Sequence, residues 1–491
     1  MAKCAYQIRN SLLFAGLLGI LTAALGISLA QSPEPQREQL LNGLRVLLVP
    51  RPGDSNVLIK LRVHSGAAFD IAGKAGTMSL LGELMFPDQV TYDYFKEEVN
   101  GQLLVQTDLD SINVTMQGRA SEFDRMIDTL RVAVVNTPLS PENVTRIRDA
   151  RAKALREKNP TPADVADRII AERLFGSFPY GRPVAGTAAT LQNIDRADLM
   201  LARDRFLSPN NATLAVIGGV DQRHAMRTLR QLLGGWRKSE ELVPATFRMP
   251  DQPDARVLVA NYPSAQTAQI RIATRGLARG DRDCAAANLL ANIARERWQK
   301  LLPESASTFV RHEAYTLPGI FVMGTEVDNA TATKALEAAK TVLKSLVDSP
   351  VSPAEIESAR NIQLRNNAAS PNENLAKNWL DVEAYSLETP SEQLRALNAL
   401  TASDLQRVAI RLFREASFAI AIVGNADSLK THISQAGAQI EGEQSTTAGA
   451  PQNNQSTGTP DQPKKRRTFV FIDPKGSHPV LKTPTPTPKP D

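Results

Sequence analysis

The order of apolar and polar positions repeats in two successive parts of the chain. Each part begins with short runs rich in Val, Ile and Leu, the composition of buried strands, and continues with segments of helical periodicity. A further apolar run closes each part. The runs that predict strands are residues 45–50, 57–63 and 213–217 in the first part, and residues 256–261, 269–274 and 418–423 in the second. This repetition indicates a duplicated domain.

Landmark residues support the duplication because their separation is nearly constant. A helix should begin after the Ser-Pro dipeptides at 140–141 and 352–353, since Ser is a favoured N-cap and Pro fits the first turn. The other paired landmarks are Asp198 with Asp404 and Gly218 with Gly424. We therefore expect an α+β fold of two homologous α/β sandwich domains, each with its helices packed on one face of its sheet.

The ends of the chain differ in composition from its centre. Beyond about residue 436, Gln, Thr, Asn, Gly and Pro dominate, and such a segment cannot bury enough apolar surface to fold. We expect a signal peptide at 1–30, an N-terminal domain at 31–235, a linker at 236–253, a C-terminal domain at 254–435 and a disordered tail at 436–491.

Residues 1–30 have the features of a secretory signal. Lys3 and Arg9 precede an apolar run that begins at Leu12, and a small residue, Ala30, lies at the expected cleavage site. The protein is therefore expected to be exported, either to a periplasm or out of the cell. The apolar run is also long enough to act as an uncleaved membrane anchor.

Composition narrows the functional classes. A hydrophobic content of 42% over 491 residues supports two globular cores, and a formal charge of +5 is too small to indicate a nucleic-acid partner. Of the two cysteines, Cys4 lies in the expected signal, so Cys284 alone remains in the mature chain. The sequence therefore predicts no internal disulfide and no cysteine metal site.

A helix predicted over residues 75–86 carries the main candidate site. Its apolar residues recur at spacings of three and four, and Ser79, Gly82 and Glu83 share another face. Side chains at positions i, i+3 and i+4 can converge on one point. These three residues are therefore candidates for a site, if their chemistry allows one.

The residues before this helix resemble the start of a known family. The segment 42–46, Asn-Gly-Leu-Arg-Val, and the loop from Gly66 to Gly76 are similar to the approach to the zinc helix in the insulinase (pitrilysin) metallopeptidases, which include mitochondrial processing peptidase subunits. The loop at 178–187 and the segment 209–212 extend the resemblance, which covers residues 39–433. It implies two homologous domains that face each other as a clamshell, and zinc metalloendopeptidase activity.

The zinc ligands of that family are missing from the matching positions. In the family the helix carries H-x-x-E-H, two zinc ligands and a catalytic Glu, whereas this chain has Ser79, Gly82 and Glu83 there. The third family ligand, a Glu, would match residues 152–154, which contain no carboxylate. The sequence therefore predicts no catalytic residue and no bound zinc. Glu83 is expected to pair with an Arg or Lys, or to contact a water-filled cavity.

The family also uses an Arg and a Tyr, about seven residues apart, to hold the substrate peptide. Neither is in register here. Arg311 and Tyr315 are candidates for the same substrate-binding role, although only four positions separate them. The neighbouring His312 and Glu313 are expected to be surface residues.

These observations lead to one main hypothesis and two alternatives. The chain is expected to be a catalytically inactive subunit that binds unfolded peptides and pairs with an active, zinc-bearing insulinase-family subunit. The first alternative is an active metallopeptidase with a non-standard metal site, built around Glu83 and His64. The second is a peptide-binding envelope factor with no peptidase partner.

Overall fold

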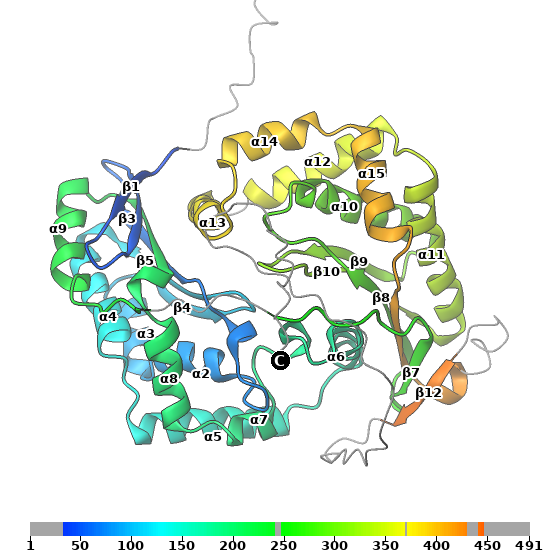
Figure 1. Ribbon diagram of the computed structural model, residues 1–491, viewed down its shortest axis with the longest axis horizontal. Coiled ribbons are helices and arrows are strands. Elements are labelled where there is room, and N and C mark those ends of the chain that lie inside the picture. The colour runs from blue at the N-terminus through cyan, green and yellow to red at the C-terminus, as the bar shows by residue number, and fades with distance from the viewer. Residues whose placement is uncertain (1–32, 241–246, 369–370, 430–439, 446–491) are drawn as a thin grey trace, which may run out of the picture. The chain divides into compact units, whose positions relative to one another are not determined.

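A computed structural model describes residues 33–240, 247–368, 371–429 and 440–445. The expected signal at 1–30 and most of the expected tail lie outside the described residues. The described residues from Pro35 onward form two successive halves, each built around a six-stranded sheet (Figure 1). No helix among the described residues is long and apolar enough to cross a membrane.

The first half begins with three strands and a buried helix, of which the apolar pattern predicts the second and third strands and the helix. Its elements are β1 (Gln36–Gln39), β2 (Arg45–Pro50), β3 (Asn56–Val63), η1 (Ala67–Phe69), α2 (Thr77–Leu84), α3 (Gln89–Glu97), β4 (Gln102–Thr107), β5 (Ile112–Arg119), η2 (Ala120–Glu122), α4 (Phe123–Val135), α5 (Pro141–Glu157), α6 (Pro162–Phe175), η3 (Pro179–Gly181), α7 (Ala188–Gln192), α8 (Arg196–Phe206), η4 (Pro209–Asn211), β6 (Ala212–Gly218) and α9 (Gln222–Leu233).

The second half repeats most of this order. Its elements are β7 (Val257–Asn261), β8 (Thr267–Arg275), α10 (Cys284–Leu301), β9 (Ser307–Glu313), β10 (Ile320–Asp328), η5 (Asn329–Thr331), α11 (Ala332–Asp348), α12 (Pro353–Ala368), α13 (Pro371–Tyr385), α14 (Pro390–Ala399), α15 (Ala402–Phe413), β11 (Ala419–Gly424) and β12 (Ile440–Ser445). The predicted strands and both Ser-Pro helix starts are confirmed.

The two sheets share five strands in equivalent order. The first sheet runs β1-β2-β6-β3-β5-β4 and the second runs β12-β7-β11-β8-β10-β9, so β2 corresponds to β7 and β6 to β11. In the first sheet, the closing strand β6 pairs parallel with β2 and antiparallel with β3. In the second sheet, the closing strand β11 pairs parallel with β7 and antiparallel with β8. The predicted duplication and the α+β class are therefore confirmed.

The outermost strands differ between the halves. β1 pairs antiparallel with β2, whereas β12 pairs parallel with β7. β12 lies within 436–491, which composition predicts to be disordered, so that prediction is wrong for residues 440–445. The physical reason is that the edge of β7 has backbone groups free to pair with an added strand, whatever the composition of that strand.

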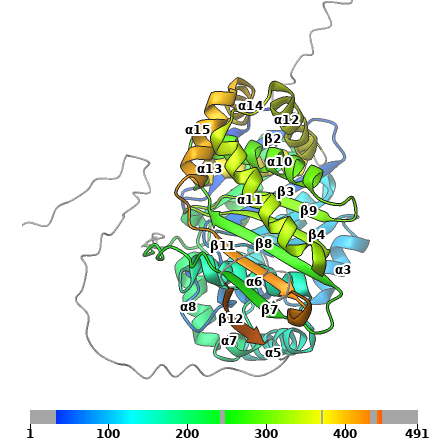
Figure 2. The same cartoon turned by 90° about the vertical axis from the view of Figure 1, so that its right-hand side faces the viewer.

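Each sheet carries its own helices on one face, as expected. In the first half, α2, α4, α8 and α9 bury side chains against the face that includes Val46, Leu48 and Leu214. In the second half, α10, α11 and α15 cover the corresponding face, and Figure 2 shows α11 crossing the strands of that sheet.

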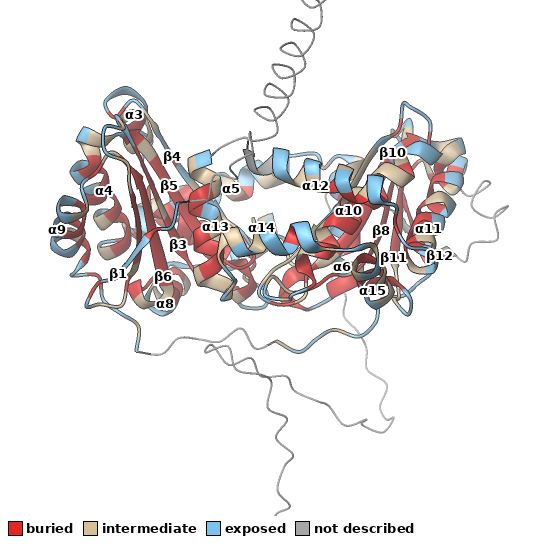
Figure 3. Cartoon of the chain, turned by 90° about the horizontal axis from the view of Figure 1, so that it is seen from above, coloured by how far each residue is buried: buried red, intermediate tan, exposed pale blue. Residues whose placement is uncertain are grey.

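The opposite face of each sheet is covered by a helix from the other half. α13, from the second half, packs Trp379 and Leu380 against Leu47 and Ile217 of the first sheet. α6, from the first half, packs on β8 and β11 of the second sheet. Figure 3 shows buried residues on the facing sides of both sheets. This exchange explains why β6 and β11 are buried along their whole length.

Candidate functional site

The candidate site begins with the N-terminus of α2, which a buried carboxylate caps. The Asp70 side chain accepts hydrogen bonds from the backbone N–H of Gly76 (2.7 Å) and of Met78 (2.8 Å). Gly76 precedes the helix with φ of +99°, a conformation that favours glycine. Burial raises the pKa of Asp70 to about 6, although these two N–H groups and Arg182 act in the opposite direction. A carboxylate here satisfies otherwise unpaired helix donors.

A guanidinium group joins two of the three candidate residues on α2. The Arg151 side chain comes from α5, which packs beside α2. Its Nη2 donates to Ser79 Oγ at 2.8 Å, and its Nη1 donates to Glu83 Oε2 at 3.1 Å. The expected basic partner of Glu83 is therefore Arg151. A single positive charge lies between the residues that occupy the family's two histidine positions on α2.

Gly82, at the position of the family's catalytic Glu, lies against the sheet. It is buried, and a Cβ atom added there would lie 2.8 Å from Thr107 Oγ1 and 3.4 Å from Ile112 Cγ2. The distance to Thr107 Oγ1 is shorter than normal van der Waals contact, whereas the distance to Ile112 Cγ2 is at its lower limit. The glycine therefore allows α2 to approach β4 and β5, and the side chains of Thr107 and Ile112 leave little room for a larger residue.

The residues at this place do not fit a zinc ion. Zinc sites in proteins use three or four Cys, His or carboxylate ligands. Here Glu83 supplies one carboxylate, Ser79 a hydroxyl, and Arg151 a cation that would repel a metal. Within the described ranges, no group of three or more His, Cys, Asp and Glu side chains is arranged to hold a metal ion.

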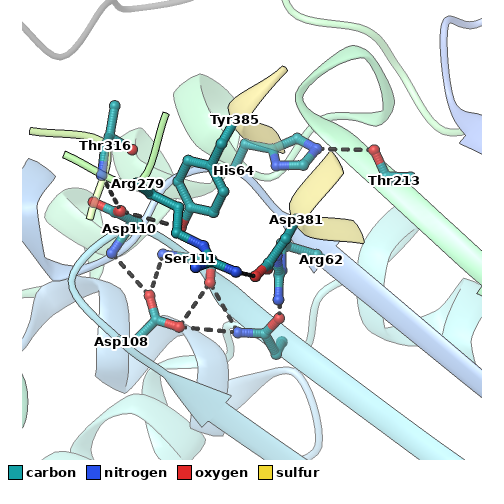
Figure 4. Close-up of polar contacts among 11 residues, drawn as sticks. Arg62, His64, Asp108, Asp110, Ser111, Thr213, Arg279, Thr316, Asp381 and Tyr385 are labelled. Atoms are coloured by element: carbon teal, nitrogen blue, oxygen red, sulfur yellow. Dashed lines mark hydrogen bonds and ion pairs between the residues drawn. The ribbon is translucent and has the colours of Figure 1, made fainter. Parts of the chain in front are cut away.

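His64, which one alternative pairs with Glu83, has different partners. Its Nε2 lies 2.9 Å from Thr213 Oγ1 (Figure 4). The same atom lies 3.2 Å from the Arg45 guanidinium. Burial lowers the pKa of His64 to about 3, and Arg45 and Arg62 contribute in the same direction. The ring is therefore neutral at ordinary pH and belongs to a buried polar cluster.

Arg311 and Tyr315, the candidate substrate-binding residues, meet through Glu313. Arg311 Nε lies 3.3 Å from Glu313 Oε1, and the Tyr315 hydroxyl donates to Glu313 Oε2 at 2.9 Å. Arg311 is half exposed on the edge strand β9, over the Phe309 ring. Tyr315 is partly buried against Tyr180, and burial raises its pKa. A spacing of four residues thus brings both side chains to one carboxylate.

The prediction that His312 is a surface residue is wrong. Its ring is partly buried, accepts a hydrogen bond from the backbone N–H of Leu277 at 3.0 Å and contacts Asn288. Burial lowers the pKa of His312 to about 4. Its position on β9 beside the chain leading to α10 explains the burial, which the sequence pattern did not indicate.

A buried ionic cluster links the two halves, and the sequence pattern did not reveal it. Asp381 of α13 accepts from Arg62 of β3 at 2.6 Å and from Arg279, which precedes α10, at 2.8 Å. Burial alone would raise the pKa of Asp381, but the two arginines hold it below its ordinary value. Arg62 also donates to Asn113 at 2.9 Å. The signal that the sequence offered for this cluster was Arg62, a charged residue inside the apolar strand β3.

Asp110 is the centre of a second set of contacts between the halves. It accepts hydrogen bonds from the backbone N–H of Thr316 (2.6 Å) and from Tyr385 (3.2 Å) (Figure 4). It also accepts one from the Tyr180 hydroxyl at 3.0 Å. Burial raises the pKa of Asp110, with a contribution from the charge of Asp108, and the bonds from Thr316 and Tyr180 oppose the shift. Both clusters border a cavity of about 160 Å³, lined by Arg62, His64, Ala68, Phe69, Asp110, Ser111, Tyr180, Phe247, Thr316, Ala384 and Tyr385.

Solved structures share this fold. A protease from Helicobacter pylori superposes with a TM-score of 0.73 at 18% identity, covering 80% of this chain and 99% of that one. A peptidase M16 inactive domain from Pseudomonas fluorescens gives a TM-score of 0.72 at 16% identity, with 80% and 98% covered. The chain therefore has the fold of these M16 structures.

Two family models match the sequence itself. Residues 45–188 match the insulinase (peptidase family M16) model, and residues 193–363 match the peptidase M16 inactive domain model. Together they span both halves, and the chain belongs to the insulinase family.

Named relatives include enzymes and subunits. An uncharacterized zinc protease of Mycobacterium bovis is 25% identical over 205 residues, which are 41% of this chain and 47% of that protein. The mitochondrial-processing peptidase subunit beta of Blastocladiella emersonii is 21% identical over 434 residues, which are 82% and 91% of the two chains. The chain thus spans about half the length of the first of these relatives.

Proposed function

We propose that this chain is a catalytically inactive insulinase-family protein that serves as the non-catalytic, peptide-binding subunit of a two-subunit zinc peptidase. The contact that carries the proposal is the bridge from Arg151 to Ser79 and Glu83. An active site of this family needs a cation held by protein ligands and a carboxylate base. Here a protein cation takes the central position, and the base position is Gly82.

A partner subunit is proposed because the fold is kept while the catalytic groups are absent. One relative is named as a subunit of a processing peptidase, which describes a protein that acts within an assembly. A chain with intact domains and no zinc ligands on α2 can still provide surface for an extended peptide. Export, if residues 1–30 act as a signal, would place this assembly outside the cytoplasm.

The test is affinity purification of the tagged full-length chain from its own cells, followed by a peptidase assay. We expect a co-purifying chain that carries H-x-x-E-H, and chelator-sensitive cleavage of unstructured peptides by the complex. The chain alone should not cleave them. In the complex, a Gln in place of the partner's motif Glu should abolish cleavage, whereas Glu83→Gln in this chain should leave the rate unchanged.

Two results would contradict the proposal. Chelator-sensitive cleavage by the isolated chain, lost in Glu83→Gln, would establish the non-standard metallopeptidase alternative. Peptide binding by the chain with no H-x-x-E-H partner would establish the alternative of a peptide-binding factor without peptidase.

A further inference from the structure

The helix α9 presents an unusual surface on the outer side of the first half. Asp221 caps it by accepting from the backbone N–H of His224 at 3.1 Å. Its apolar side chains are buried toward the first core: Ala225, Met226, Leu229 and Leu233. Figure 3 shows the opposite side of α9 exposed. The helix is therefore held by one face, and the other is available for contact.

Three arginines form that exposed face. Arg223, Arg227 and Arg230 are spaced by four and three residues, so they lie on one side of the helix. Among the residues that the structure describes, no ion pair engages any of the three. They line a shallow groove of about 730 Å³ with Gln222, Met226, Gln231 and Glu38, and Glu38 is the one acidic member. We call these three residues the α9 arginine face.

An exposed apolar residue lies at one end of this face. β1 is tied to the start of α9 by a hydrogen bond from Gln222 to Glu38 at 3.4 Å. The turn after β1 is tied to the other end, because Asn42 donates to the carbonyl of Leu233 at 2.8 Å and of Trp236 at 3.1 Å. At the tip of this turn, Leu41 is fully exposed. An exposed apolar side chain thus lies at one end of the α9 arginine face.

We propose that the α9 arginine face and Leu41 dock on an anionic lipid surface. Arginines attract the negative charge of lipid headgroups, and an exposed apolar side chain beside them can enter the headgroup region. A second copy of this chain would bring like charges together, which disfavours self-association through this face.

The sequence before β1 favours a membrane over a soluble acidic partner. Residues 12–30 are predominantly apolar, and only residues 31–35 separate them from β1. At about 3.5 Å per residue, five residues span less than about 20 Å. If residues 12–30 are held in a bilayer, the strand beside α9 lies close to its surface. The proposal concerns α9 and does not depend on the catalytic state of the chain.

Vesicle flotation of the full-length chain tests this proposal. Neutral vesicles of phosphatidylcholine alone are compared with anionic vesicles that contain about 30% phosphatidylglycerol. Residues 12–30 can also bind lipid, but any such binding that does not depend on lipid charge cancels in the ratio of the two affinities. Each basic side chain near an anionic bilayer contributes about 1 kcal/mol, or about fivefold. We expect the arginine face to give a ratio on the order of a hundredfold at low salt.

Two triple variants separate the face from net charge. Arg223→Gln/Arg227→Gln/Arg230→Gln should bring the ratio close to one. The control removes three other exposed cations, in the second half, and should keep the ratio; its substitutions are Arg282→Gln, Lys300→Gln and Lys334→Gln. Leu41→Asn should lower binding to anionic vesicles several-fold. Unchanged thermal melting of each variant establishes that it is folded.

Several outcomes would overturn the proposal. One is an equal affinity of the wild-type chain for the two kinds of vesicle. Another is that both triple variants lower the affinity ratio equally, and a third is that neither variant lowers it. Binding to polyglutamate but not to anionic vesicles, lost in the α9 variant, would overturn it in favour of an acidic protein partner.

Discussion

At the scale of single residues, one ion pair changes what the family's zinc helix can do. Arg151 donates to both Ser79 and Glu83, so the place of a metal ion holds a guanidinium that the chain itself supplies. Glu83 is about half exposed, and surface ion pairs contribute little free energy. The consequence of this pair is therefore chemical: the site has neither the ligands nor the net negative charge that attract zinc.

Gly82 provides a prediction at the same scale. Gly82→Ala should lower the free energy of unfolding by about 1 kcal/mol. Overpacking against Thr107 costs about 1–3 kcal/mol, and the better helix propensity of Ala returns up to about 1 kcal/mol. Urea denaturation measures the difference. The matched control is Gly235→Ala, since a Cβ at Gly235 meets no atom within 4 Å.

The control variant should change the free energy of unfolding by less than about 0.5 kcal/mol. If Gly82→Ala proves as stable as the wild type, then Thr107 moves aside, and close packing at Gly82 does not explain the missing Glu.

At the scale of elements, two helices have exchanged sheets. α13 belongs to the second half by sequence but covers the first sheet, and α6 does the reverse. Local periodicity could predict that these segments are helices and that β6 and β11 are apolar strands. It could not indicate that the second face of each strand is buried by a helix from the other half of the sequence, because periodicity carries no information on distant partners.

Trp379 on α13 tests this exchange. Trp379→Ala should lower the free energy of unfolding by about 3–5 kcal/mol, the usual cost of deleting a buried aromatic side chain. Native-state hydrogen exchange should also show lost protection in β2 and β6, which α13 covers. Leu346→Ala, on α11 within the second core, serves as the comparison.

In the Leu346→Ala variant, the loss of protection should begin in the second half. The two variants are compared under conditions where their stability is equal. If β2 and β6 are then as protected in Trp379→Ala as in Leu346→Ala, α13 does not hold the first sheet in solution.

At the scale of the whole molecule, buried polar groups join the two halves. Asp381 binds arginines from both halves, and Asp110 of the first half accepts from Thr316 and Tyr385 of the second. Such groups are costly to bury unpaired, so their partners fix how the halves meet.

Stability should fall in acid partly because His64 is kept neutral. The folded pKa is about 3, below the ordinary value of 6.5, so the unfolded chain takes up a proton below about pH 6.5 and the folded chain does not. Stability from this residue is thus present above pH 6.5 and lost as the pH falls toward 3. Between pH 7 and pH 5 the loss is about 2 kcal/mol.

Denaturant unfolding of the wild type and of His64→Gln at pH 7 and pH 5 checks this. For each protein, the free energy of unfolding at pH 5 is compared with its own value at pH 7. The difference between the two pH values should shrink by about 2 kcal/mol relative to wild type. An unchanged difference would mean that His64 is protonated in the folded protein.

The sequence alone was enough for the duplicated fold and for the three altered positions on α2. Strands, Ser-Pro helix starts and Ser79, Gly82 and Glu83 are local features that spacing reveals. The partner of Glu83 was predicted only as a basic residue, since α5 begins nearly 60 positions later and its rotation about its axis is set by packing. Asp70, Asp110 and Asp381 escaped sequence analysis because a lone Asp in a loop or helix is usually exposed.

We infer that the family's metal position on α2 does not bind zinc in this chain. The most direct test of this inference is metal analysis of the purified full-length protein after incubation with excess zinc and removal of the unbound metal. We predict much less than one zinc per chain, unchanged in Glu83→Gln. One zinc per chain that a chelator removes, and that Glu83→Gln fails to bind, would contradict the account.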